Sequence, residues 1–317
     1  MKKIVIFGGG TGLSQILKGL KLFPIDITAV VSVSDNGRST GRLREELHIP
    51  AVGDITKVML AMSNANEDII NLMNYRFIKS KSLGNHSVKN LLLTALIDMK
   101  GSISSSLPIL EEILSIDCGK ILPLTETNVD LVALTESGKK IYGEEQISKY
   151  PDAIKKIEYN NPIVVNPKVI EAVQQADLII FSAGSLYTSI IPHLIDKNLV
   201  QTIKNSKASK MYICNLFTQP NETEGYAVAD HINKINEYIG KNTIDVVIAN
   251  NGQMDSKLVE KYRVNEQKDP VVLDEENLQK MNVKLLSDKL YTIENECYRH
   301  DSLKVAYLVF RYLMEGN

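Results

Sequence analysis

Residues 2–20, KKIVIFGGGTGLSQILKGL, decide the fold class of this 317-residue chain. Residues 4–7 are a short β-branched apolar run that stops at glycine, which is typical of a buried parallel strand. The segment 13–23 places its apolar residues at helical spacing on one face, and residues 27–33 read as the next strand. The stretch therefore predicts strand, glycine turn, helix and strand, joined as a right-handed crossover unit.

The same rhythm returns in the second half of the chain, where apolar strand-like runs end in glycine or polar residues and alternate with amphipathic segments. Residues 131–142 alternate, turn at Ser137-Gly138 and alternate again, which predicts an antiparallel hairpin attached at a sheet edge. We predict one α/β domain over 1–317 with a three-layer Rossmann-like fold and a mostly parallel sheet. Its parts are a first βαβ unit at 1–35, a helical middle at 54–115, a hairpin region at 119–160 and a second crossover half at 167–317.

Composition excludes several classes of protein. The formal net charge of −2 leaves no electrostatic footprint for nucleic acid. The three cysteines are far apart and form no C-x-x-C pair, so neither a disulfide framework nor a zinc site is indicated. No apolar run approaches the length of a membrane span, and the first residues lack the pattern of a signal peptide. We expect a cytoplasmic location.

The first glycine turn predicts an anion site. Its residues leave the first strand and lead into a helix whose unpaired N–H groups attract phosphate. These residues are Gly8, Gly9, Gly10, Thr11 and Gly12. Leu13 stands where a dinucleotide fingerprint has its third glycine, and no G-K-[ST] follows, so the turn is not a P-loop. The alternative is a tight turn that binds nothing.

Asp35 follows the second strand, where dinucleotide folds place a ribose-binding acid. The competing interpretation is an exposed aspartate of an Asp-Asn-Gly turn. Downstream, Arg42 together with Ser39 could clamp a phosphate, or belong to a solvated face.

A second anion turn is predicted at Gly184 and Ser185, which follow another strand. The G-x-S-x-G pattern of a serine hydrolase is not met there. Asn215, Thr218 and Gln219 leave the next strand with both donors and acceptors, which suits a uracil edge or sugar hydroxyls as well as ordinary turn capping.

Acid–base chemistry has few candidates in this sequence. Asp35, Asp54 and His86 are the ones we name, although Asp54 also suits the first turn of a helix and His86 the start of another. His300 likewise reads as the neighbour of a helix cap. No metal site is predicted beyond Asp35 as a weak candidate ligand, because divalent metals favour several carboxylate oxygens.

Several blocks of the sequence, in order along nearly the whole chain, resemble the CofD/YvcK family. The blocks are GGGTGLSQILKGLK (8–21), SVSDNGRSTGRLREEL (32–47), GDITK (53–57), NHSVKNLLLTAL (85–96), ADLIIFSAGSLYTSIIPHL (176–194), CNLFTQPNETEGY (214–226) and RHD (299–301). Their spacing is similar to that of the YvcK branch. The resemblance implies a CofD-like Rossmann fold in a cytoplasmic bacterial protein that binds UDP-sugars, UDP-N-acetylglucosamine especially, with a role in cell shape and wall synthesis during gluconeogenic growth.

The resemblance also implies a set of pocket residues. Carried over onto this sequence, they are Gly8 to Leu13, Asp35, Asn36, the segment with His86, Ser87 and Asn90, then Gly184, Ser185, Leu186, Tyr187, Asn215, Tyr262 and Arg299. Two departures stand out. Asn36 replaces a second aspartate of the family, which weakens a metal-dependent transferase, and Lys89 replaces a glycine at the pocket rim.

Three functions remain open at this point. The first is a nucleotide-sugar-binding regulator without turnover, which needs no cofactor beyond its UDP-sugar ligand. The second is a CofD-like transferase that moves a phosphate-linked group from a GDP-type nucleotide donor with a divalent metal. The third is an NAD(P)-binding protein, because the first βαβ unit would suit a dinucleotide. The protein partner, expected in the cell-wall synthesis machinery, is not identified by the sequence, and a homodimer is left open.

Overall fold

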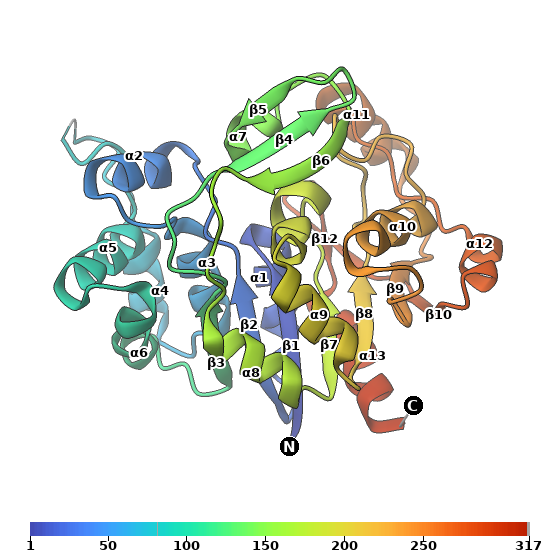
Figure 1. Ribbon diagram of the computed structural model, residues 1–317, viewed down its shortest axis with the longest axis horizontal. Helices are drawn as coiled ribbons and strands as arrows, with labels where there is room; N and C mark the ends of the chain where they lie inside the picture. Colours follow the sequence, from blue (N-terminus) through green and yellow to red (C-terminus); the bar gives the residue numbers. More distant parts are fainter. Residues whose placement is uncertain (81, 316–317) are drawn as a thin grey trace.

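A computed structural model describes residues 1–80 and 82–315, and its centre is a seven-stranded sheet (Figure 1). The strands are β1 (Lys2–Gly8), β2 (Ile25–Val31), β3 (Gly119–Pro123), β7 (Leu178–Phe181), β8 (Ser209–Ile213), β9 (Val246–Asn250) and β10 (Lys284–Asp288). Their order is β10-β9-β8-β7-β1-β2-β3, and every neighbouring pair is parallel. The predicted α/β class with a parallel sheet is confirmed.

Helices cover both faces of this sheet, because the strands are apolar on both sides. In β1, Ile4 and Ile6 pack on one face and Val5 and Phe7 on the other. The first face carries α1 (Gly10–Leu20), α3 (Gly53–Met62), α4 (Glu67–Asn74), α5 (Val88–Lys100), α6 (Ile103–Ile113) and α13 (Ser302–Glu315). The second face carries α8 (Pro167–Gln175), the π-helix η1 (Leu186–Ile190), the 3-10 helix η2 (Ile191–Leu194), α9 (Lys197–Asn205), α10 (Val228–Ile239) and α12 (Glu275–Lys280).

The strand order reverses between β1 and β7. From β1 the chain continues outward to β2 and β3, whereas from β7 it continues the other way to β8, β9 and β10. In open α/β sheets ligands bind outside the carboxyl ends of the strands at such a switch point. Because β1 ends at Gly8 and β7 at Phe181, both predicted glycine turns flank it.

A small antiparallel sheet lies above the carboxyl ends of the main sheet, at the top of Figure 1. It consists of β4 (Leu131–Thr135), β5 (Lys140–Tyr142) and β6 (Ile154–Tyr159), with the short helix α7 (Glu144–Ile147). We call residues 131–159 the cap. The predicted hairpin is present as β4 and β5, and β6 adds a third strand on the other side of β4. The predicted hairpin region was wrong to include β3, which pairs with β2 in the main sheet.

The last part of the chain holds a second antiparallel pair, β11 (Tyr291–Glu294) and β12 (Cys297–His300), which the sequence did not reveal. Arg299 and His300 therefore lie on a strand rather than at a helix start. Asp301, which follows them, caps α13, since the Lys304 N–H donates to Asp301 Oδ1 at 3.1 Å. The remaining helices are α2 (Arg38–Leu47) and α11 (Ser256–Glu266). Within the described ranges, no helix has the length and apolar character needed to cross a bilayer.

Candidate functional site

A cavity of about 560 Å³ lies at the switch point. Both glycine turns, α7 of the cap and the tyrosines of α11 and β12 contribute to its wall. The predicted residues that line it are Gly9, Gly10, Thr11, Gly12, Asp35, Asp54, Gly184, Ser185, Asn215, Thr218, Gln219, Tyr262 and Arg299. Segments far apart in the sequence thus meet at one crevice, as the strand order requires.

The first glycine turn needs glycine for close approach. A Cβ on Gly12 would lie 2.1 Å from the carbonyl oxygen of Ala183, so α1 packs on the second turn only without a side chain there. Gly10 has φ +58, and its N–H donates to the carboxylate of Asp54. The sequence predicted that this N–H would bind a phosphate, but in the structure it already has an acceptor in Asp54.

Acidic side chains gather at this end of the cavity. The carboxylate of buried Asp54 lies 3.1 Å from Lys57 Nζ, and Asp35 and Glu144 face the same pair. Burial raises the pKa of Asp54, against the attraction of Lys57. Burial and then the charges of Asp54 and Asp35 raise the pKa of Glu144 to about 8. The cluster therefore retains a proton near neutral pH, and Glu144 can donate it inside the cavity.

The CofD resemblance implies a divalent metal, and the described part of the chain does not fit one. No group of three or more His, Cys, Asp or Glu side chains in residues 1–80 and 82–315 is arranged to hold a metal ion. The carboxylate of Asp54 is committed to Lys57 and Gly10, and Asp35 Oδ1 accepts from the Gly37 N–H at 2.8 Å.

The second turn is held from the next strand. The Asn215 amide pairs with both sides of Gly184, accepting from its N–H at 2.8 Å and donating to its carbonyl at 2.7 Å. Ser185 Oγ accepts from the Thr188 N–H at 3.0 Å and so begins η1. Thr218 is also occupied, because its Oγ1 accepts from the Asp269 N–H at 3.0 Å. Asn215 thus shapes the cavity wall through its two bonds to Gly184, whereas the Thr218 hydroxyl still has its proton to donate.

Aromatic side chains form the opposite end of the cavity. Phe217 stacks on Tyr262 with ring centroids 4.5 Å apart, and Tyr298 lies 5.3 Å from Phe217. The Tyr262 hydroxyl accepts from the Tyr298 N–H at 2.9 Å, which ties α11 to β12. Exposed Arg299 follows Tyr298 on β12 and also lines the cavity.

His300 is not a free base at this site. Its Nε2 donates to the Cys214 carbonyl at 3.0 Å, and burial lowers its pKa to about 4.

Sequence reasoning missed part of the lining. The missed residues are Gln15, Lys57, Glu144, Ala183, Ser189, Leu216, Phe217, Glu266, Lys268, Cys297, Tyr298 and His300. Phe217 could have been predicted from the sequence, because it lies in the segment after β8 between Asn215 and Thr218, which were both predicted site residues. For Glu144 there was none, because it belongs to a four-residue helix of the cap.

Other predicted residues lie outside this lining. Leu13, Leu186 and Tyr187 are core residues, and Gly8 lets β1 approach Ser182, whose Oγ would lie 2.2 Å from a Cβ at position 8.

The segment around His86 forms a separate polar group beside α2. His86 Nδ1 lies 2.8 Å from Ser39 Oγ, and burial followed by the charge of Arg42 lowers the pKa of His86. Asn90 Oδ1 accepts from the Thr56 hydroxyl at 2.8 Å. Ser87 is the N-cap residue of α5, but its Oγ has no hydrogen-bond partner. None of these side chains lines the cavity at the switch point.

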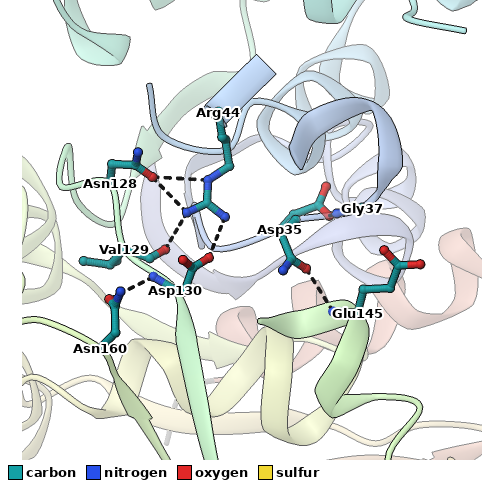
Figure 2. Close-up of polar contacts among 9 residues, drawn as sticks. Asp35, Gly37, Arg44, Asn128, Val129, Asp130, Glu145 and Asn160 are labelled. Carbon is teal, nitrogen blue, oxygen red and sulfur yellow. Dashed lines mark hydrogen bonds and ion pairs between the residues drawn. The ribbon is translucent and has the colours of Figure 1, made fainter. Parts of the chain in front are cut away.

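Asn36 connects the loop after β2 to the cap. Its Oδ1 accepts from the Glu145 N–H at 2.9 Å, at the start of α7. Nearby, the buried guanidinium of Arg44 donates to Asn128 Oδ1 at 2.8 Å and pairs with Asp130 at 3.0 Å (Figure 2). The loop and helix α2 are therefore bonded to the cap and to the segment that leads into it from β3.

Comparison with known proteins places the chain in a family. Residues 4–291 match the model of the family described as 2-phospho-L-lactate transferase CofD. The chain is 40% identical over 317 residues to the gluconeogenesis factor of Bacillus subtilis, covering 99% of this chain and 98% of that protein. It is 38% identical over 317 residues to the gluconeogenesis factor of Listeria innocua, covering 99% and 97%.

The structure agrees with these matches. A crystal structure of a UPF0052 family member from Bacillus halodurans superposes with a TM-score of 0.94 at 35% identity, covering 98% of this chain and 99% of that one. A family match over most of the chain, with relatives of this identity along its whole length, shows that the chain belongs to the CofD family.

Proposed function

We propose that this chain binds a nucleotide sugar of the UDP-N-acetylglucosamine type and acts as a regulator rather than as a catalyst. The observation that carries the proposal is the cavity of about 560 Å³, with glycine turns along one side and Tyr262, Tyr298 and Arg299 at one end. Ligand sites of a few hundred cubic ångströms with a small number of convergent polar groups suit ligands of this size.

Each part of the cavity has a role in this proposal. The uridine lies toward Tyr262 and Arg299, where an aromatic edge and a guanidinium are available. The diphosphate lies against the part of the cavity wall that Thr11, Gly12 and Gly184 form, where the two glycines present backbone without a side chain. The hydroxyls of the sugar face Asp35 and Glu144, which accept hydrogen bonds.

The biological role is proposed from the relatives. Proteins that are 40% and 38% identical over this whole chain are named gluconeogenesis factors. We assign this chain a gluconeogenesis-related role in the bacterial cytoplasm, and within it a contribution to cell shape and wall synthesis through a protein partner that senses the ligand state.

Calorimetry of the purified protein with UDP-N-acetylglucosamine, UDP-glucose, NAD and GDP tests the binding claim. We expect the UDP-sugars to bind and NAD and GDP to bind at least about tenfold more weakly, a difference of about 1.4 kcal/mol. Preferential binding of NAD would support a dinucleotide site. Preferential binding of GDP would support a transferase of the CofD type. No binding of any UDP-sugar would refute the proposal.

The transferase is the second candidate, and the raised pKa of Glu144 beside Asp35 and Asp54 favours it. Long incubation with UDP-N-acetylglucosamine, Mg²⁺ or Mn²⁺ and candidate acceptors, followed by mass spectrometry, separates the two. We expect the nucleotide sugar to be returned unchanged. Protein-dependent formation of UDP, UMP or a transferred product, lost in Asp35→Ala but kept in Glu136→Ala on the exposed cap turn, would overturn the regulator.

A further inference from the structure

Glu222 is a buried acid that does not line the cavity and yet bonds to its wall. Only 6% of the residue is exposed. Its Oε2 accepts a hydrogen bond from Ser185 Oγ, its Oε1 lies 3.4 Å from Ser148 Oγ, and the Tyr187 N–H also donates to its carboxylate. A buried carboxylate is retained at low cost only where donors surround it, and here three converge.

The hydrogen bonds of Ser185 require an acceptor at this position. Ser185 Oγ accepts from the Thr188 N–H at 3.0 Å and lies 2.8 Å from the Thr188 hydroxyl, which donates to it. A hydroxyl has two lone pairs and one proton, so Ser185 is left with only its proton to share. The carboxylate of Glu222 accepts the hydrogen bond that the Ser185 hydroxyl donates and thereby fixes the rotamer of Ser185 at the cavity wall.

The same acid reaches the cap. Ser148 directly follows α7, whose first residue, Glu144, has its Oε1 3.4 Å from the Thr188 hydroxyl. Both ends of α7 are thus connected to the turn at residues 185–188, one through Glu222 and one through Thr188. The Asn36 side chain, which accepts from the Glu145 N–H, adds a third attachment. Glu222 and Thr188 both join Ser185 to α7 through side chains outside the cavity lining of the described residues, Glu222 at Ser148 and Thr188 at Glu144.

We propose that Glu222 is a positioning residue of the ligand site, which orients Ser185 and holds α7, with Glu144, over the cavity. It acts through Ser185 and Ser148 and does not touch the ligand itself. The effect on affinity rests on the proposed function, whereas the effect on the turn and on α7 is independent of any ligand.

Calorimetry with UDP-N-acetylglucosamine tests the first effect. We expect Glu222→Ala and Ser185→Ala each to weaken binding about tenfold, and the double variant to bind no more weakly than the weaker single variant, because each substitution removes the same hydrogen bond between Ser185 and Glu222. Glu222→Gln should keep most of the affinity, since its Oε1 can accept from Ser185 while its NH₂ donates to Ser148 Oγ. The matched control is Glu224→Ala, which removes an exposed glutamate two positions away. Additive losses, or an unchanged Kd in Glu222→Ala, would overturn the proposal.

Hydrogen exchange of the ligand-free protein tests the second effect. We expect Glu222→Ala to speed exchange at residues 186–190 and 144–148, with α11 unchanged. Ser148→Ala should do so at 144–148 alone, and Ser185→Ala at 186–190, so the test does not depend on Glu222→Ala folding well. Unchanged exchange in both segments in all three variants would contradict the positioning role. If the wild-type protein binds no UDP-sugar, the proposed function fails and this measurement alone decides the role of Glu222.

Discussion

The two ends of the cavity differ in charge and in how many of their polar groups already have partners within the protein. At the glycine-turn end, Asp35, Asp54 and Glu144 surround Lys57, and Asp54 already accepts from the Gly10 amide. At the other end, the hydroxyl of half-buried Tyr262 accepts from the Tyr298 N–H, whereas the guanidinium of exposed Arg299 is left open to a ligand by the described residues.

This difference shows that a glycine turn at a helix start is not by itself a free phosphate site. An anion at Gly10 must displace Asp54 or approach ionised carboxylates, and both reduce the gain expected from helix amides and their dipole. Affinity for a charged ligand should therefore depend strongly on the backbone geometry near Gly12 and Gly184 and on the cation at Arg299. Substitutions at each end can test that division.

Gly10→Asp should have the largest effect and abolish detectable binding, a loss of about a hundredfold or more. The residue has φ +58, which disfavours side chains, and its Cβ would lie 3.3 Å from Asp54 Oδ1 and bring a second charge beside it. Calorimetry with UDP-N-acetylglucosamine measures the loss.

The matched control for this variant is Gly138→Asp in the cap. Gly138 also has a positive φ, of +84, but a Cβ there would meet nothing within 4 Å. It should bind as the wild type does, with a similar backbone penalty on stability. If Gly10→Asp retained wild-type affinity, the first turn would have only a structural role.

Arg299→Ala should weaken UDP-N-acetylglucosamine about tenfold, the scale of one lost charge-assisted hydrogen bond. Because Arg299 is exposed on β12, its replacement should not disturb the fold, and a loss of affinity can be attributed to the ligand contact. Arg311→Ala on α13, an arginine outside the cavity lining, should leave the Kd unchanged. An unaltered Kd in Arg299→Ala would mean that Arg299 does not contact the ligand, and binding would then have to depend on the acidic end of the cavity.

Glu144→Gln should have the smallest effect, and it should appear as a pH dependence of stability. The pKa of Glu144 is raised from 4.5 to about 8, so the folded protein holds this proton more tightly than the unfolded chain does. Its contribution to stability is complete below about pH 4.5 and is lost as pH rises through about 8. Gln stays neutral throughout, so the melting temperature of the variant relative to wild type should increase between pH 5 and 9, by on the order of 2 °C.

Glu136→Gln, at an exposed position of the cap, controls for a general change of charge in this comparison of melting temperatures. A difference between Glu144→Gln and wild type that stays flat from pH 5 to 9 would contradict the burial of a protonated Glu144. A difference that falls with pH would mean that the acidic end stabilises the ionised form.

The first crossover and its glycine turn were predictable because their signals are local. Strand and helix periodicities repeat within a few residues, and the polar exits after β7 and β8 mark the carboxyl ends of buried strands. Tyr262 and Arg299 were assigned from the family resemblance, and both line the cavity. The position of Arg299 on a strand was missed, because the four-residue strands β11 and β12 are too short to show a period.

The sequence by itself determined the α/β class, the two glycine turns and the side of the sheet on which they meet, since backbone conformation and apolar spacing act over short distances. Tertiary structure alone decided which donor faces which acceptor. Asp54 accepts from the Gly10 amide, Glu222 accepts from the Ser185 hydroxyl, and His86 lies with Ser39 away from the cavity. These partners are separated by 37 or more residues, and only the packing of helices and the cap against the sheet brings them within hydrogen-bond distance.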